Sequence, residues 1–180
     1  MRKCAICLSI VMFIGLFIPT VATAGEAFIK GGYIAYVGQD DDLNLDLNSL
    51  IFSGGTDWKI SDYFSLGPEI QYSWKSVEVP LQEDKQKFHF FNLYGNVKVH
   101  IGDEGIRPFF GAGIGLVSAT VLLEDLSGTE KKSVFGAQFM GGIVAGKKGG
   151  PAFVAEIQFK VPTGDLNNIK SANIMAGVVF

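Results

Sequence analysis

The chain has 180 residues, with 15 lysines and arginines against 18 aspartates and glutamates, a formal net charge of −3. A mildly acidic chain with no basic cluster is a poor candidate for a nucleic-acid partner, so none is expected. The mean hydropathy is positive, at +0.29. Beyond residue 24, however, no stretch approaches the roughly 18 consecutive apolar residues that a membrane-spanning helix needs. The apolar content therefore indicates either a buried sheet core or a sheet that faces lipid.

The first 24 residues have the pattern of a secretory signal peptide. Arg2 and Lys3 form a short basic region, residues 5–18 are almost all apolar, and residues 22–24 read Ala-Thr-Ala. A small-residue site of this kind, directly after a short apolar stretch, is typical of a leader that is cleaved. We expect cleavage after residue 24 and a single domain over residues 25–180.

Several kinds of site are not expected in residues 25–180. The two cysteines, Cys4 and Cys7, lie in the predicted leader, so no disulfide, thiolate nucleophile or cysteine-ligated metal is expected afterwards. The acidic run 40–42, even with Asp46, matches no EF-hand spacing and is interpreted as a solvated loop. We therefore expect no metal site and no cofactor.

Turn signals divide residues 25–180 into eight segments. Each segment has about ten or more residues, enough to cross a membrane as a tilted strand. The breaks fall at 38–42, 61–62, 80–87, 102–105, 124–132, 147–150 and 163–168. Longer polar breaks alternate with tight ones, as in a barrel that has both chain ends in the periplasm and its long loops outside. The expected external loops lie near residues 39–46, 79–87, 124–132 and 163–169.

Within the segments, apolar and polar side chains alternate with the period of a strand. The polar faces carry a set of charged or titratable residues: Glu69, Lys75, Lys98, His100, Glu156 and Lys160. Because a barrel of eight strands is only wide enough inside for side chains, unpaired charges there would be costly. We expect these residues to form a lumen charge network of opposite-sign pairs, centred on Glu69, Lys98 and Glu156.

The same alternation is found in soluble sandwiches and lipocalin-like barrels, so it does not by itself place the sheet in a membrane. The aromatic residues favour the membrane, because they gather near both ends of the segments, as the two interfaces of a bilayer select. One group is Trp58, Phe64, Phe110, Phe153 and Phe180, and the other is Tyr72, Trp74, Phe91 and Phe135.

The segment 107–116, Arg-Pro-Phe-Phe-Gly-Ala-Gly-Ile-Gly-Leu, is the most distinctive internal motif. A run of alternating glycines can indicate phosphate binding, but that requires a helix to follow, and none is predicted. We interpret the glycines as inward positions that leave room for bulky neighbours. The final segment, 170–180, alternates in the same way and ends on an aromatic residue.

This motif, the leader, the eight segments and the final Phe180 together resemble the small outer-membrane barrel superfamily. The superfamily includes the OmpA transmembrane domain, OmpX and the opacity-type surface proteins. The resemblance implies an all-β fold, an eight-stranded antiparallel transmembrane up-and-down β-barrel in a Gram-negative outer membrane. It also implies that Asn173, Val178 and Phe180 form a membrane-assembly signal read by the barrel-assembly machinery, with Met175 where a glycine is common.

The expected role is structural or surface-interacting, with the lumen filled by side chains. The expected partners are outer-membrane lipid, lipopolysaccharide and an extracellular ligand held by the loops, and the expected state is a monomer. A narrow pore for ions or small solutes is the first alternative. A lipid A-modifying enzyme is the second, because His89 faces lipid near the outer rim, but neither His89 nor His100 is followed two residues later by a serine. No catalytic residue is therefore assigned.

Overall fold

The computed structural model describes residues 25–37, 47–78, 85–102, 105–123, 129–147, 150–167 and 169–180. The predicted leader and the acidic run 40–42 lie outside these ranges. No helix within the described ranges has the length and apolar character to span a membrane. The strands are β1 (Gly25–Val37), β2 (Ser49–Lys59), β3 (Phe64–Glu78), β4 (Lys85–His100), β5 (Ile106–Leu123), β6 (Thr129–Gly146), β7 (Ala152–Pro162) and β8 (Lys170–Val179), with a 3-10 turn η1 (Gly164–Leu166) between β7 and β8.

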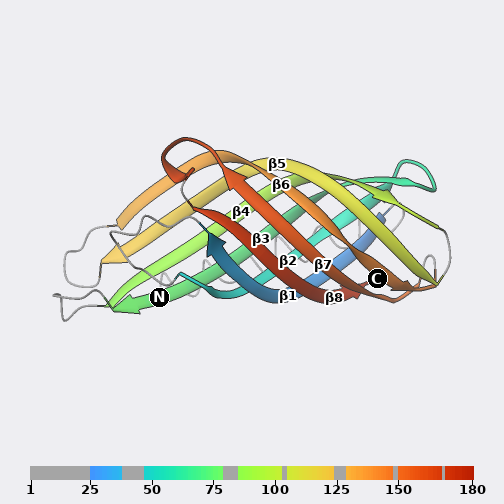
Figure 1. Ribbon diagram of the computed structural model, residues 1–180, viewed down its shortest axis with the longest axis horizontal. Coiled ribbons are helices and arrows are strands. Elements are labelled where there is room, and N and C mark those ends of the chain that lie inside the picture. The colour runs from blue at the N-terminus through green and yellow to red at the C-terminus, as the bar shows by residue number, and fades with distance from the viewer. Residues whose placement is uncertain are drawn as a thin grey trace, which may run out of the picture.

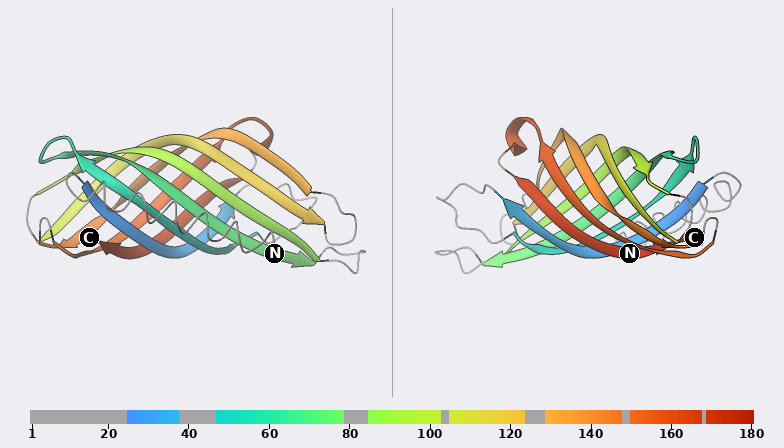
Figure 2. Two further views of the ribbon diagram at one scale, coloured as in Figure 1. Left: turned by 180° about the vertical axis from the view of Figure 1, so that it is seen from behind. Right: turned by 45° about the vertical axis from the view of Figure 1, so that its right-hand side comes forward.

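The strands form one closed barrel in which each strand pairs antiparallel with the next. Pairing of β1 with β8, from Phe28 opposite Val179 to Val37 opposite Lys170, closes the wall. All strands tilt across the long axis of the molecule (Figure 1), and the same tilt is visible from behind and in an oblique view (Figure 2). The predicted fold class, an eight-stranded antiparallel up-and-down barrel, is confirmed.

The two ends of the barrel differ. We call the end with the short connections 60–63, 101–105 and 147–151 the turn end, and the opposite end the loop end. The C-terminus lies at the turn end, on the right in Figure 1. There the amide nitrogen of Phe180 donates to the carbonyl oxygen of Ala27 at 2.8 Å, which ties the last residue to β1.

Two predicted loops are shorter than expected. The prediction placed loops at 79–87 and 124–132, but β4 already begins at Lys85 and β6 at Thr129. The ladder between β5 and β6 continues until Leu122 pairs with Thr129. Backbone pairing satisfies the peptide groups of these residues whatever their side chains, so a polar sequence beyond the apolar band does not mark the end of a strand.

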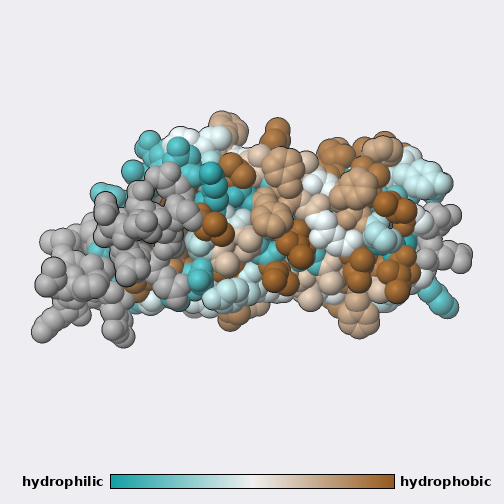
Figure 3. All heavy atoms as spheres, viewed as in Figure 1, coloured by the Kyte–Doolittle hydropathy of each residue, from teal (hydrophilic) through white to brown (hydrophobic). Residues whose placement is uncertain are grey.

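The outer wall of the barrel is apolar. Side chains of β7 alternate between buried and exposed without a break from Ala152 to Pro162. Outward residues such as Ile114 and Phe153 are 76% and 72% exposed, and brown and tan side chains cover much of the middle and right of Figure 3. A continuous exposed apolar surface of this kind marks contact with lipid or another apolar partner. All nine aromatic residues of the two predicted girdles point outward, each at least 39% exposed.

Glycines allow the walls to approach closely in the segment 107–116. A Cβ atom on Gly115 would lie 2.7 Å from the Cα of Tyr94, and one on Gly111 would lie 3.2 Å from the Cα of Lys98. Real Cβ atoms rarely come so close, so the inward glycines let the backbone of β5 lie against that of β4. The glycines thus serve packing, but the neighbour is mainly the backbone of the adjacent strand rather than bulky side chains.

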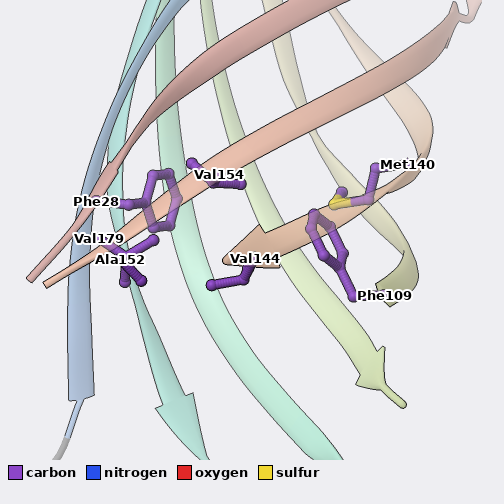
Figure 4. Close-up of a cluster of buried hydrophobic side chains, with 7 residues drawn as sticks. All are labelled: Phe28, Phe109, Met140, Val144, Ala152, Val154 and Val179. Carbon is purple, nitrogen blue, oxygen red and sulfur yellow. The ribbon is translucent and has the colours of Figure 1, made fainter. Parts of the chain in front are cut away.

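The interior is built in layers along the barrel axis. The turn-end cluster is apolar and consists of Phe28, Phe109, Met140, Val144, Ala152, Val154 and Val179, which project into the barrel from several strands (Figure 4). The loop-end cluster consists of Leu47, Phe90, Tyr94, Val117, Ala119 and Leu166. Between them lies a layer of buried polar and charged side chains.

Candidate functional site

Three charged residues meet at the middle of the lumen. Lys30 Nζ lies 2.9 Å from Glu69 Oε1 and 3.0 Å from Glu156 Oε2, so one ammonium group bridges two carboxylates. The three residues come from β1, β3 and β7, and each is at most 2% exposed. Strand parity explains the convergence, since each residue stands at an inward position of its strand.

Side-chain amides extend this bridge across the lumen. Five of them come from five strands: Gln71, Asn96, Gln138, Gln158 and Asn173. Asn96 Nδ2 donates to Glu69 Oε2 at 2.9 Å, and Gln158 Nε2 donates to Glu69 Oε1 at 3.2 Å.

The remaining amides bond to one another. Gln138 Nε2 donates to Asn96 Oδ1 at 2.6 Å, while Gln71 Nε2 and Asn173 Nδ2 donate to Gln158 Oε1 at 2.9 and 3.1 Å. We call these five amides, with Lys30, Glu69 and Glu156, the central network. Its eight residues join β1, β3, β4, β6, β7 and β8 and are each at most 2% exposed, so the network fills the cross-section of the barrel.

Lys98 lies one layer closer to the turn end than was predicted. The sequence predicted Lys98 as the cation that pairs with Glu69 and Glu156. In the structure its Nζ instead pairs with Asp57 Oδ2 at 2.7 Å. Lys30 takes the position predicted for Lys98. The Nζ atoms of Lys30 and Lys98 both lie 4.6 Å from the ring centroid of Phe28, so the aromatic ring contacts the cation of each ion pair.

The other predicted lumen residues are spread along the axis. His100 is at the turn end, with Nε2 3.0 Å from Ser65 Oγ. Lys75 is at the loop end, where Nζ donates to the carbonyl oxygen of Asn48 at 2.8 Å. Lys160 is 4% exposed and faces a cavity on the loop side of the central network. The structure thus joins Glu69 and Glu156 through Lys30. The other four predicted residues, Lys75, Lys98, His100 and Lys160, lie above or below this bridge along the barrel axis.

Sequence reasoning missed three inward charges: Lys30, Asp57 and Arg107. A single lysine in the otherwise apolar stretch 27–37 was a signal that could have found the first of them. In the structure Phe28 pairs with the inward residue Val179, so Lys30, two residues further along β1, also lies inside.

Little space remains on either side of the central network. A cavity of about 20 Å³ lies on the loop side, and one of similar size lies on the turn side beside Lys98 and His100. Each holds little more than one water molecule. Within the described ranges, no group of three or more histidine, cysteine, aspartate or glutamate residues could hold a metal ion.

On the outer wall, His89 belongs to an aromatic patch near the loop end. Its Nδ1 lies 2.7 Å from the hydroxyl oxygen of Tyr72, and Tyr72 stacks on Trp74 with ring centroids 5.6 Å apart. Thr120 is the residue opposite His89 in the β4–β5 register. The imidazole is thus held by a phenol, which suits a membrane-interface anchor.

The residues of the predicted assembly signal occupy different environments. Asn173 is fully buried and belongs to the central network. Val178 lies on the outward parity opposite Phe153, and Phe180 is 61% exposed at the turn end. One strand therefore presents an aromatic end to the exterior and an amide to the lumen.

A scan against protein-family models gives no match, and a search of curated proteins gives none either. Solved structures do match. Neisserial surface protein A has a TM-score of 0.67 at 15% identity, over 86% of this chain and 95% of that one. Ail, the attachment invasion locus protein of Yersinia pestis, solved with the heparin analogue sucrose octasulfate, has a TM-score of 0.59 at 15% identity over 87% and 97%. The N-terminal barrel of Pseudomonas aeruginosa OprF has a TM-score of 0.55 at 14% identity over 87% and 98%. The chain therefore has the fold of small outer-membrane β-barrels.

Proposed function

We propose that this protein is an integral outer-membrane barrel with a structural or surface-interaction role, and that its lumen neither conducts nor catalyses. The central network carries the proposal, because hydrogen bonds and ion pairs link side chains of six strands across the whole lumen. Opening a path would require breaking several buried charge-assisted bonds, each worth about 1.5–3 kcal/mol.

Three observations support the outer-membrane location. The outward wall is apolar and exposed, aromatic residues ring both of its ends, and the fold is that of small outer-membrane barrels. The predicted leader of residues 1–24 would deliver the chain across the inner membrane. Asn173, Val178 and Phe180 would then serve as the signal read by the barrel-assembly machinery, and the turn end would face the periplasm.

Lipid and lipopolysaccharide are the partners proposed for the outer wall. Near the loop end, one row across four strands pairs Trp74 with His89, His89 with Thr120, and Thr120 with Lys131. These outward residues supply an aromatic anchor, a hydroxyl and an ammonium group just beyond the apolar band. This is the chemistry that meets phosphate-bearing headgroups at a membrane interface.

The loops are proposed to hold a surface ligand that is cationic or bridged by divalent cations. Between the strands of the loop end, residues 38–46, 79–84, 124–128 and 163–169 contain no lysine or arginine. Their carboxylates are Asp40, Asp41, Asp42, Asp46, Glu83, Asp84, Glu124, Asp125 and Asp165. Connecting segments with such an excess of carboxylates favour positive partners. It differs in sign from one suited to the polysulfated ligand of Ail.

Planar-bilayer recording tests the closed lumen. The purified protein should insert and give no discrete current steps. In vesicles reconstituted from the same preparation, resistance of the barrel to added protease shows that the protein inserts and that an absence of current is informative. Stable channels from the unmodified protein would favour the narrow pore instead.

Mass spectra of lipid A test the catalytic alternative. Spectra from cells with and without the protein should be the same, because the imidazole of His89 bonds to Tyr72 rather than to a serine hydroxyl. A change in acyl chains that disappears with His89→Gln would establish an enzyme.

A further inference from the structure

One sector of the outer wall is polar at the level of the loop-end aromatic residues. Strand pairing sets Trp74, His89, Thr120 and Lys131 side by side in one outward row over β3, β4, β5 and β6, which we call the polar row. Neighbours in such a row stand about 5 Å apart, so the side chains of adjacent strands can contact one small group. The polar row therefore offers an imidazole, a hydroxyl and an ammonium group to a single ligand.

Aromatic neighbours hold the imidazole of His89 in place. Its Nδ1 lies 2.7 Å from the hydroxyl oxygen of Tyr72, and the two rings stack with centroids 6.1 Å apart. Tyr72 also stacks on Trp74, and Trp74 on Phe52, with centroids 5.6 and 5.9 Å apart. When the phenol donates to Nδ1, the ring proton lies on Nε2, which is then a donor. Because the ring is already held, little ordering is needed when a ligand binds to Nε2.

Hydroxyl groups add further donors beside the imidazole. Thr120 stands between His89 and Lys131 in the register. One row nearer the turn end, Ser118 Oγ and Ser133 Oγ lie 2.8 Å apart, so one of these hydroxyls donates to the other. The second hydroxyl proton of the serine pair remains available to a ligand. Together with the ammonium group, these donors suit the oxygens of an anion.

The charge on this part of the wall has one sign. Lys131 is exposed, and within the described ranges no hydrogen bond or ion pair engages its ammonium group. Lys87 follows His89 on the same face of β4, two residues closer to the loop end. The outward residues of β4 from 87 to 93, of β5 from 116 to 122 and of β6 from 131 to 135 include no carboxylate. An anion at this level is therefore attracted by the wall and not repelled by it.

Among the described residues, the opposite sector has no comparable row. At the loop end of β1, β2 and β7, the outward residues Val37, Leu50 and Val161 are exposed and aliphatic. The outward cation there is Lys170 of β8, whose partner in the β1–β8 register is Val37. An exposed lysine beside an aliphatic partner lacks the hydroxyl and imidazole that accompany Lys131. The combination of donors is thus a feature of β3–β6.

We propose that the polar row binds one lipopolysaccharide molecule through a phosphate of its lipid A. The inference rests on the proposed outer-membrane location, which places the loop end in the outer leaflet. Lys131 Nζ, the Thr120 hydroxyl and His89 Nε2 donate to the phosphate oxygens. The serine pair donates to polar groups at the root of the acyl chains, and the chains lie over Leu116 and Phe135, which are exposed on the outer wall.

The chemistry of the phosphate favours lipid A over a phospholipid. A phosphomonoester carries about −1.5 to −2 charges at pH 7 and three strong acceptor oxygens. A phospholipid diester carries a single charge and has only two such oxygens. One ammonium group with an imidazole and a hydroxyl supplies three donors at one place, so the polar row matches the monoester better.

Native mass spectrometry of the folded protein in non-ionic detergent tests the site, with bisphosphorylated lipid A as the added ligand. The unmodified protein should retain one lipid A molecule per barrel. Lys131→Ala should weaken binding on the order of tenfold or more, because a charge-assisted hydrogen bond is lost. Lys170→Ala is the matched control. It removes another exposed outward lysine at the loop end and should leave binding unchanged.

Two milder variants test the neutral donors. Thr120→Val keeps the shape of the side chain and removes only the hydroxyl, and His89→Phe keeps a ring and removes Nε2. Each should weaken lipid A binding severalfold. Dephosphorylated lipid A, phosphatidylglycerol and inorganic phosphate separate the sources of the contact. All three should bind more weakly than bisphosphorylated lipid A, and the binding of dephosphorylated lipid A should not depend on Lys131.

Some results would overturn the proposal. One is equal binding of lipid A by Lys131→Ala and Lys170→Ala. Another is binding of dephosphorylated lipid A, phosphatidylglycerol or inorganic phosphate as tight as that of bisphosphorylated lipid A. A folded protein recovered from the outer membrane that binds no lipid A would contradict this site alone. Recovery of the protein from the soluble periplasm would contradict the outer-membrane location as well.

Discussion

Replacing Lys30 by methionine tests the energetic role of the central network. Methionine nearly preserves the length of the side chain but removes the charge that bridges Glu69 and Glu156 at 2.9 and 3.0 Å. Removing one partner of a buried ion pair costs about 3–5 kcal/mol, because the remaining charge is left uncompensated. Here one change strands two carboxylates that are each at most 2% exposed. We therefore expect the free energy of unfolding to fall by about 4–5 kcal/mol.

Equilibrium unfolding by urea in phospholipid vesicles measures this change. The two tryptophans, Trp58 and Trp74, both face outward, so their fluorescence should report loss of the membrane-embedded barrel. Lys59→Met is the matched control. It breaks the pair between Lys59 and Glu26, in which the lysine side chain is 32% exposed, and should cost at most about 1 kcal/mol.

A combined variant separates charge from packing. Adding Glu69→Gln and Glu156→Gln to Lys30→Met removes the stranded charges and should recover most of the lost stability, since neutral isosteres avoid the desolvation penalty. If the free energy of unfolding of Lys30→Met instead lies within about 1 kcal/mol of that of the Lys59→Met control, the central network does not stabilise the barrel and the reasoning is refuted.

Three further changes have defined outcomes. Gly115→Ala should lower the free energy of unfolding by about 1–3 kcal/mol, because the added Cβ would be forced against β4. Gly95→Ala is the control and should change little, because its Cβ would meet only a carbonyl oxygen at 4.0 Å. Urea midpoints compare the two variants. Lys98→Ala should cost about 1.5–3 kcal/mol by losing its bond to Asp57, and unchanged stability with new conductance would contradict a filled lumen. Phe180→Ala should reduce the amount of folded barrel in cells, measured by migration before and after boiling, but not refolding in vitro.

Much of the fold could be predicted from the sequence, because a barrel strand has one strict rule, alternation between two faces. The inward positions of Glu69 and Glu156 and the outward positions of Trp74 and Phe153 all follow from that rule. Phe180 set the parity of the last strand, and pairing carries parity around the wall.

The rest could not be predicted because alternation weakens where both faces are apolar. In β1, Phe28 and Ile34 point inward while Ile29 and Tyr33 point outward, so hydropathy did not reveal the face of Lys30. Parity also fixes only the side of the wall on which a residue lies. The choice of ion-pair partner depends on strand stagger, which brings Lys30 to residues of β3 and β7 rather than to residues of its paired strands β2 and β8.

Cysteine labelling in intact cells tests the proposed location and orientation most directly. Both cysteines of the sequence lie in the predicted leader, so an introduced cysteine would be the only thiol of the mature chain. Asp165→Cys at the loop end should react with a bulky, membrane-impermeant maleimide on intact cells. Asp62→Cys at the turn end should react only after the outer membrane is permeabilised. Equal labelling of both sites on intact cells, or recovery of the protein in the soluble periplasmic fraction, would contradict a barrel that spans the outer membrane with its loops outside.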